Sequence, residues 1–286
     1  PYVYQGSTYG YTHGGDTSTP VHRNEIDKVQ FVASANSTDV GNLHQGMSYT
    51  SGSCSTTHGY AAGSVANTNI SKYAFASDGD GVNIGDLTTA KASGGGNSSQ
   101  YYGYQIGGWQ GPAGDRKDKY SFTTDGDSTD VGNLTIARSH MCGVTDTVYG
   151  YSGGGSQAGT QYDRIDRWSF ASDGDSVDVG NMTYGQERSG GASSLTHGYG
   201  HGGRGGTATT DIEKFAFAAS SNATDVGDLT IASWMGIGQT FTTHGYTGPV
   251  GGYNVTINRY AFASDGNATD VGDLTVGRMN CGAAHV

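Results

Sequence analysis

Phe262-Ala-Ser-Asp-Gly-Asn-Ala-Thr-Asp-Val-Gly-Asp-Leu-Thr275 is the stretch that decides the fold, because versions of it occur six times. Its closing tetrapeptide returns as Val40-Gly-Asn-Leu43, Ile84-Gly-Asp-Leu87, Val131-Gly-Asn-Leu134, Val179-Gly-Asn-Met182, Val226-Gly-Asp-Leu229 and Val271-Gly-Asp-Leu274. The glycines of these copies are separated by 44, 47, 48, 47 and 45 residues. A period in the mid-forties is typical of the blades of a β-propeller.

Each repeat contains the signals for four short strands. In the fifth repeat these are a small-residue strand over 184–194, a strand over 199–203 that ends in a double glycine, an alternating strand over 212–218 and a last strand over 223–229. Phe215 and Phe217 fall on one face of the third strand, and we expect such aromatic residues to pack neighbouring blades together. No apolar stripe with a period of 3.6 predicts a helix. The sequence therefore predicts an all-β, six-bladed β-propeller with four antiparallel strands per blade.

The two chain ends predict how the ring closes. Residues 275–286 read as a first strand with nothing after it, while the N-terminus supplies the remaining strands of a blade. One blade is therefore expected to combine strands from both termini, which leaves no exposed sheet edge inside the ring. Because the repeat runs from end to end, we expect residues 1–286 to form a single domain.

Composition narrows the classes of partner. The formal net charge of −11 argues against nucleic acid and against anionic membranes, since phosphate binding needs a basic surface. No apolar run reaches the 18 residues that would predict a membrane-spanning helix. No signal peptide is recognisable, and a start at Pro1 without Met suggests a processed or excised segment. Cys54, Cys142 and Cys281 are odd in number and not equivalent in the repeat, so we expect free, partly buried thiols rather than a disulfide framework.

The double glycines carry a family resemblance. They close the second strand at 14–15, 107–108, 153–154, 202–203 and 251–252, where the sequence resembles the kelch repeat. Lys91, Arg138 and Arg278 stand where that family has a basic residue entering the next blade. The chain departs from the pattern in two ways, with Phe in place of the usual Trp and a single glycine at Gly63.

The amino-acid sequence of the repeat also resembles the kelch-like repeats in structural and tail-associated proteins of marine bacteriophages. This resemblance implies a virion or extracellular location. It further implies a non-enzymatic structural or adhesion module that binds a host surface or a neighbouring virion protein, and a symmetric homo-oligomer would be usual for a fibre.

The Asp-rich hairpins are the sharpest candidates for a metal site. Oxygen ligands alternate at Asp125, Asp127 and Asp130, and again at Asp173, Asp175 and Asp178. Ca²⁺ takes 6–8 such oxygens, often from a loop of this kind. Asp-Gly is also what a two-residue hairpin turn needs for its backbone, and we favour this interpretation over calcium. The recurring later Asp (Asp130 and Asp178 here) is expected to accept backbone hydrogen bonds.

No other motif predicts catalysis or a cofactor. His58, His197 and His244 share one turn position in three blades, which would spread them around a rim, and His13 and His201 share another repeat position. Solvated turn histidines are favoured over metal ligands for both groups. A kelch-type metal oxidase would need a Tyr/His/Cys constellation on the axial face, and no catalytic group departs from the repeat. We therefore expect no enzyme activity.

The departures from the repeat lie in the loops after the double glycines. Trp109, Tyr162, Arg204 and Tyr253 in these loops could stack on sugars or contact a protein partner. Plain exposed loop is the alternative. An adhesion module is the favoured function, with a carbohydrate-binding, lectin-like propeller as the alternative and a metal oxidase as the second alternative.

Overall fold

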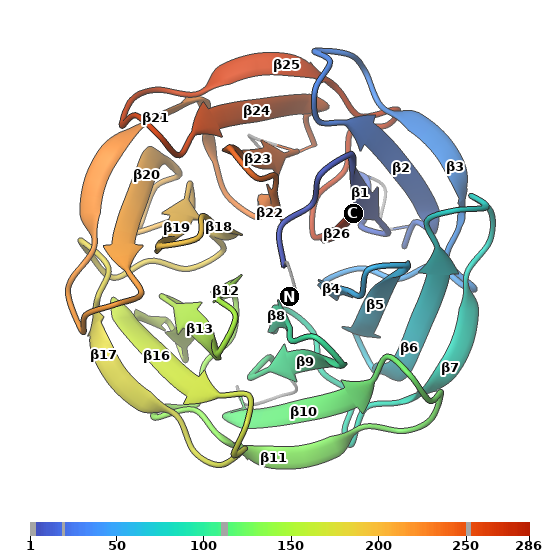
Figure 1. Cartoon of the computed structure of the whole chain (residues 1–286), viewed down its shortest axis with the longest axis horizontal. Helices are drawn as coiled ribbons and strands as arrows, with labels where there is room; N and C mark the ends of the chain where they lie inside the picture. Colours follow the sequence, from blue (N-terminus) through green and yellow to red (C-terminus); the bar gives the residue numbers. More distant parts are fainter. Residues whose placement is uncertain (1–3, 19–20, 110–113, 250–252) are drawn as a thin grey trace.

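The protein is a ring of six four-stranded antiparallel sheets around a central axis, as seen in a computed structural model of the chain (Figure 1). The structure describes residues 4–18, 21–109, 114–249 and 253–286. Over these ranges the chain forms no helix, and hence none long and apolar enough to span a membrane. The predicted six-bladed β-propeller is confirmed.

Each blade runs from an innermost strand beside the axis to an outermost strand. Blade 1 contains β26 (Gly282–His285), β1 (Tyr9–His13), β2 (Glu25–Gln30) and β3 (Thr38–Asn42). Blade 2 contains β4 (Ser51–Cys54), β5 (His58–Ser64), β6 (Asn67–Ala74) and β7 (Val82–Asp86). Blade 3 contains β8 (Gly95–Ser98), β9 (Tyr102–Ile106), β10 (Arg116–Ser121) and β11 (Thr129–Asn133).

The second half of the ring repeats this order. Blade 4 contains β12 (Cys142–Thr145), β13 (Tyr149–Gly153), β16 (Arg164–Ser169) and β17 (Val177–Asn181), with a small extra hairpin of β14 (Ser156–Gln157) and β15 (Thr160–Gln161). Blade 5 contains β18 (Gly190–Ser193), β19 (His197–His201), β20 (Thr209–Ala216) and β21 (Thr224–Ser233). Blade 6 contains β22 (Ile237–Thr240), β23 (His244–Gly248), β24 (Thr256–Ala261) and β25 (Thr269–Asp273).

Blade 1 closes the ring with strands from both chain ends, as predicted. The C-terminal strand β26 pairs antiparallel with β1, in a register that sets Tyr11 opposite Ala284. Figure 1 shows β1 and the C-terminal strand β26 close to the axis, on the inner side of β2. Because β26 supplies the innermost strand, β1 is paired on both sides, with β26 and with β2.

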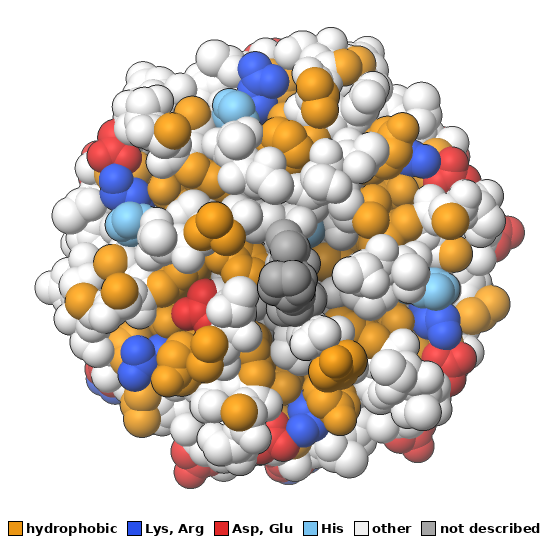
Figure 2. All heavy atoms as spheres, viewed as in Figure 1, with side chains coloured by type: hydrophobic (Ala, Val, Ile, Leu, Met, Phe, Trp, Pro, Cys, Tyr) orange, Lys and Arg blue, Asp and Glu red, His pale blue; other side chains and the backbone are white. Residues whose placement is uncertain are grey.

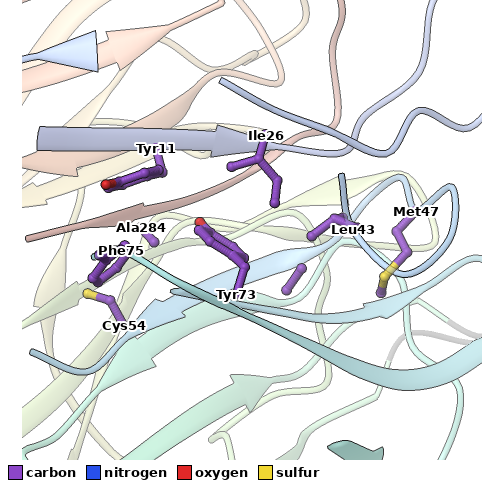
Figure 3. Close-up of a cluster of buried hydrophobic side chains, with 9 residues drawn as sticks. Tyr11, Ile26, Leu43, Met47, Cys54, Tyr73, Phe75 and Ala284 are labelled. Carbon is purple, nitrogen blue, oxygen red and sulfur yellow. The ribbon is translucent and has the colours of Figure 1, made fainter. Parts of the chain in front are cut away.

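Neighbouring blades pack through an aromatic stack that recurs at all six boundaries. A tyrosine from the second strand of one blade lies against a phenylalanine that follows the third strand of the next. Ring centroids are 4.6–5.2 Å apart in the pairs Tyr11–Phe75, Tyr60–Phe122, Tyr104–Phe170, Tyr151–Phe217, Tyr199–Phe262 and Tyr246–Phe31. Figure 3 shows the first boundary, where Tyr11 lies beside Phe75. Each ring removes about 150–250 Å² from water, so these stacks form most of the apolar core.

The glycine of each closing tetrapeptide lets the next blade approach. At Gly132 φ is +128°, and a Cβ atom would lie 2.5 Å from the carbonyl oxygen of Gly174 in the next blade. The corresponding glycines of the other five repeats meet the backbone of the next blade's hairpin in the same way. The tetrapeptide that sets the period of the sequence therefore also sets the spacing of the blades.

At three of the six blade boundaries, a basic residue on the segment that enters a blade forms a buried ion pair with a carboxylate on the third strand of that blade. Lys91 Nζ lies 3.3 Å from a carboxylate oxygen of Asp118, and both side chains are at most 5% exposed. Arg138 meets Asp166 at 3.3 Å, and Arg278 meets Asp27 at 3.2 Å, again fully buried. These are the three basic residues that the kelch resemblance singled out.

At the other boundaries both partners change together. Glu213 receives a hydrogen bond from neutral Gln186, and burial raises the pKa of this carboxyl group. Where the carboxylate is replaced by Ser71 or Asn258, the basic residue is absent too, with Met47 and Ser233 in its place. A lone buried charge is costly, so the paired replacement at Ser71 and Asn258 leaves no unpaired charge at these two boundaries.

Three local predictions were wrong in detail. In blade 4 the glycine pair with positive φ is 154–155 rather than 153–154, because Gly153 is still paired within β13. The Asp-Gly hairpins are not two-residue turns, since the connection from β6 to β7 runs over 75–81. The innermost strands are also shorter than expected, four residues in β18 instead of 184–194. The glycine pair expected at 251–252 lies outside the described residues.

Candidate functional site

The innermost strands approach one another so closely that the axial channel is constricted at its middle. Five of them have a glycine at the second position, where a Cβ atom would collide with the backbone of the neighbouring strand: Gly52, Gly96, Gly143, Gly191 and Gly238. The same residues line the hollows on both sides of this level. The channel therefore presents two separate ends.

The N-terminal segment crosses one end of the channel. The Tyr4 hydroxyl donates to the carbonyl of Ser194 at 2.6 Å, and Gln5 Nε2 donates to the carbonyl of Ser193 at 3.1 Å. His285 Nε2 lies 2.7 Å from the carbonyl oxygen of Tyr4. Figure 2 views the ring from this side, where basic and histidine side chains lie mostly toward the rim.

The opposite end is framed by six residues that we call the loop-face ring: Tyr49, Ser93, His140, Arg188, Met235 and Asn280. Each precedes an innermost strand, and each has a φ of 58–66°, in the left-handed region. Five of the six neighbouring pairs in this ring are joined by a backbone hydrogen bond of 2.6–2.9 Å, from the N–H of one blade to the carbonyl of the previous blade. Non-glycine residues rarely adopt this conformation, so six of them in equivalent places is a feature of the fold.

The side chains of the loop-face ring differ from blade to blade. The rings of Tyr49 and His140 meet edge to face with centroids 6.5 Å apart, although they belong to blades 2 and 4. The guanidinium of Arg188 lies 5.4 Å from the ring of Trp234 and 3.6 Å from a carboxylate oxygen of Glu187. All six members line a recess of about 80 Å³. Aromatic, cationic, amide and thioether groups thus occupy equivalent positions of the ring. Because these groups differ, the face can make a different contact with a partner at each position, which six identical residues could not do.

Burial affects the titration of this ring. The pKa of His140 is lowered to about 4, first by burial and then by the positive charge of Arg188. The pKa of Tyr49 is raised, first by burial and then by the carboxylate of Asp16. His140 and Tyr49 are therefore neutral at pH 7, and each can donate or accept a hydrogen bond. Asn280 is already occupied, since its Nδ2 donates to Asp16 at 2.7 Å.

The predicted binding residues flank this ring but do not form one cluster. The backbone of Trp109 pairs with Ala92, and that of Arg204 pairs with Glu187, each next to a ring residue. Arg204 also lies 5.8 Å from the Trp234 ring, so it shares this aromatic face with Arg188. Trp109 and Tyr253 are 51% and 44% exposed. Tyr162 is half-buried, and its backbone carbonyl accepts from the N–H of Gln186.

Of the six aspartates predicted as possible calcium ligands, four contact the preceding blade and two accept hydrogen bonds within their own strand. Asp125 forms an ion pair with Lys72 of the preceding blade at 2.7 Å, and Asp127 accepts a backbone N–H of that blade at 3.0 Å. Asp130 accepts a backbone N–H two residues along its own strand at 3.1 Å, as predicted for the later Asp. The same three contacts are made in blade 4 by Asp173, Asp175 and Asp178.

The repeat itself shows that the charge of Asp127 is dispensable. Its role is filled by Asn222, Asn267 and Asn36 in blades 5, 6 and 1, each of which accepts the equivalent N–H. Among the described residues no three His, Cys, Asp or Glu side chains lie close enough to hold a metal ion. The structure therefore does not gather the predicted calcium ligands into one site.

The histidines fall into two groups. His58, His197 and His244 are half-buried at the predicted turn, and the ring of each hydrogen-bonds at 2.8 Å to the preceding threonine. His13 and His201 are fully buried instead, each hydrogen-bonded to a tyrosine hydroxyl of the next blade. Burial lowers their pKa values to about 3 and about 4, so both are neutral parts of the blade interface. The prediction of solvated histidines is wrong for this pair.

The three cysteines are free and buried, in agreement with the predicted absence of a disulfide framework. The loop-face ring was missed from sequence, although a signal existed. Each member lies eight residues after the glycine of a closing tetrapeptide, and the residue type there differs in every repeat.

The fold and the site together define a closed six-bladed β-propeller whose variable surface lies at one end of the axis. No family model matches this chain, and no curated protein is significantly similar to it. The resemblance to kelch repeats and to bacteriophage tail proteins therefore stays a prediction.

Proposed function

We propose that this propeller is a non-enzymatic binding module of a virion tail or another extracellular assembly, and that its loop face adheres to a host surface or to a neighbouring protein. The observation that carries the proposal is the loop-face ring. Its backbone is the same in six blades, whereas its six side chains are all different.

The chemistry of the ring favours contact with a partner over catalysis. Arg188 and Arg204 both lie against one aromatic residue, Trp234, and arginine and tryptophan are among the side chains most enriched at the energetic centres of interfaces. The recess between the ring residues is only about 80 Å³, below the 300–1,000 Å³ of most small-molecule pockets. A partner would therefore contact the face and insert at most one side chain or one small group.

Cell binding tests this proposal. Fluorescently labelled protein is incubated with intact cells of a panel of marine bacteria and measured by flow cytometry. We expect binding to a subset of strains and a loss of at least about tenfold in apparent affinity for the Arg188→Ala, Trp234→Ala double variant. The control is Val177→Ser on the outermost strand β17, where the side chain is 53% exposed. Absence of binding to every strain contradicts adhesion to a host surface, and undiminished binding by the double variant contradicts the role of the loop face.

A carbohydrate ligand is the second candidate, and the exposed rings of Trp109 and Tyr253 favour it. Both belong to loops that flank the ring, and aromatic faces are suited to the apolar faces of sugars. A glycan array separates the two candidates. A lectin would bind a defined set of glycans and lose them in Trp109→Ala or Tyr253→Ala, whereas a protein-binding face would leave the array blank.

A further inference from the structure

The N-terminal segment that crosses one end of the channel is bound there as a separate peptide would be. Residues 4–6 precede the first strand, because β1 begins at Tyr9 and pairs with β26 and β2 only within residues 9–13. We call residues 4–6 the N-terminal strap. Figure 1 shows the chain running from β1 toward the axis at this end. The strand pairing that closes the ring therefore does not include the strap.

Two side chains of the strap donate hydrogen bonds to backbone carbonyls of blade 5. The Tyr4 hydroxyl donates to the carbonyl of Ser194 at 2.6 Å, and Gln5 Nε2 donates to the carbonyl of Ser193 at 3.1 Å. Tyr4 and Gln5 are only 7% and 8% exposed. A carbonyl oxygen accepts hydrogen bonds and cannot donate them, so this part of the site favours a hydroxyl followed by an amide and disfavours a carboxylate.

The backbone of the strap is held by blades 6 and 1. The N–H of Gly6 donates to the carbonyl of Thr240 at 2.9 Å. His285 Nε2 lies 2.7 Å from the carbonyl oxygen of Tyr4, and it is the donor because a carbonyl can only accept. A Cβ atom on Gly6 would lie 2.9 Å from the Cβ of His285 and 2.9 Å from the ring of Phe31, so a larger residue would displace the strap. The bound segment is therefore defined as Tyr-Gln-Gly at three successive positions.

An exposed link joins the strap to β1. Ser7 and Thr8 are exposed, and their N–H groups donate to the carbonyl of Val286 at 2.9 Å and 2.7 Å. The N–H of Tyr9 donates to the same carbonyl at 3.0 Å. Release of the strap would break its own contacts with blades 5, 6 and 1 and leave the pairing of β1 in place.

The strap does not fill this end of the channel. A cavity of about 330 Å³ lies beside it, lined by Tyr4 and Gln5 and by residues of other blades that include Thr56 and Thr242. Its volume is within the 300–1,000 Å³ of most ligand pockets. An external peptide therefore has room here for side chains larger than those of the strap.

We propose that this end of the channel is a peptide-binding site, that the strap occupies it as an intramolecular ligand, and that its external ligand is a peptide segment in which tyrosine is followed by a side-chain amide and then by glycine. The site lies at the end of the axis opposite the loop face, so it does not rest on the function proposed above. A tethered segment competes at an effective concentration that is millimolar for a short flexible linker. The strap therefore inhibits the site, and an external segment has to displace it.

A binding experiment on the full chain tests this inhibition. A fluorescein-labelled synthetic peptide with the sequence of residues 1–8 is titrated with wild-type protein and with the Tyr4→Ala, Gly6→Val double variant, and fluorescence anisotropy is measured. We expect the variant to bind the peptide at least about tenfold more tightly, because its own strap no longer occupies the site. Circular dichroism and the urea midpoint establish that the variant is folded. A folded variant that binds the peptide no better than the wild type would overturn the proposal.

The single variant Tyr4→Phe makes the same test with a smaller change. It keeps the aromatic ring and removes only the hydrogen bond to Ser194, and we expect it to bind the labelled peptide roughly two- to tenfold more tightly than the wild type. An unchanged affinity would contradict the role of the Tyr4 hydroxyl in holding the strap.

Matched peptides test the chemistry of the ligand on the double variant. The Tyr4→Phe peptide lacks the hydroxyl, and we expect it to bind roughly two- to tenfold more weakly than the unchanged peptide. The Gln5→Glu peptide presents a carboxylate to the carbonyl of Ser193, and we expect at least about a tenfold loss. A scrambled peptide of the same composition is the control. Equal binding of all four peptides would show that this end of the channel does not recognise the Tyr-Gln-Gly segment.

Discussion

Replacing Gly132 by alanine tests whether the closing tetrapeptide sets the spacing of the blades. The new Cβ would lie 2.5 Å from the carbonyl oxygen and carbon of Gly174. These atoms cannot withdraw freely, because the N–H of Gly174 donates to the Val131 carbonyl at 2.7 Å and its carbonyl accepts from Lys117 Nζ at 2.6 Å. The blades must therefore separate locally or lose these hydrogen bonds.

The matched control is Gly126→Ala in the preceding hairpin. Gly126 has a φ of +148°, and no neighbouring atom lies within 4 Å of the place that its Cβ would take, so this variant isolates the backbone strain from the collision. That strain costs about 1–3 kcal/mol, and Gly132 at +128° bears a similar cost. The collision adds about 1–3 kcal/mol of overpacking and about 0.5–1.5 kcal/mol for each weakened hydrogen bond.

Urea unfolding followed by tryptophan fluorescence measures the difference between the two variants. We expect Gly132→Ala to lose at least about 1–3 kcal/mol more than Gly126→Ala, with an unchanged dependence on urea. Thermal unfolding should show the same order, by about 2–4 °C for each kcal/mol. Equal losses in the two variants would refute the idea that this glycine is required for the approach of the next blade.

Three further predictions concern single positions. Lys117→Ile should stabilise the protein by about 1–2 kcal/mol in urea unfolding at pH 7. Burial of the Lys117 amine lowers its pKa to about 8, and the other five blades have Ile at this position. A loss of stability would mean that the hydrogen bonds of Lys117 outweigh the cost of its buried charge. Buried His13 and His201 stay neutral in the folded protein, with pKa values of about 3 and about 4, whereas in the unfolded chain they accept a proton below about pH 6.5. Stability should therefore be full above pH 6.5 and fall by about 1.4 kcal/mol per pH unit for each histidine as the pH decreases toward the folded pKa values. Urea midpoints at pH 7 and pH 5 check this, and His201→Gln should show a shallower decline. Asp127→Asn should change the melting temperature by no more than about 2 °C, because Asn makes the same contact in three other blades. Addition of EDTA should also change the melting temperature by no more than about 2 °C. A lower melting temperature with EDTA, abolished by the variant, would support the calcium hypothesis.

The architecture could be predicted because its determinants are local and repeated. The closing tetrapeptide, the aromatic residues of the third strand and the leftover strand at the C-terminus can each be recognised in the sequence without reference to distant contacts. Their roles follow from strand alternation and aromatic burial, and the structure confirms the six blades and the closure through Tyr11 and Ala284. The exact glycine pair in blade 4 was missed because Gly153, Gly154 and Gly155 are adjacent and only backbone pairing distinguishes them.

The candidate sites were harder to predict from the sequence than the fold, because they depend on which residues of different blades meet in the closed ring. Tyr49 and His140 are 91 positions apart in the sequence, and their rings meet only in the closed propeller. Arg188 and Met235 gave no local sign of a left-handed backbone, since glycine or asparagine is the usual marker of that conformation. The contacts that Asp125 and Asp127 make with the preceding blade were likewise not predicted, because their partners belong to another repeat.

Different atoms of this propeller carry its stability and the partner binding that we propose. In the loop-face ring the hydrogen bonds between successive members use only the backbone N–H and carbonyl groups, so these bonds place no demand on the side chain. In the closing tetrapeptide the reverse holds, since Gly132 and its equivalents have no side chain because the next blade occupies that space. A substitution at Arg188 or Met235 should therefore change what the face binds without opening the ring, provided that the new residue tolerates a φ of 66°. This separation explains how six nearly identical blades can support one asymmetric surface, and it places the variation between repeats on the face that we propose binds a partner.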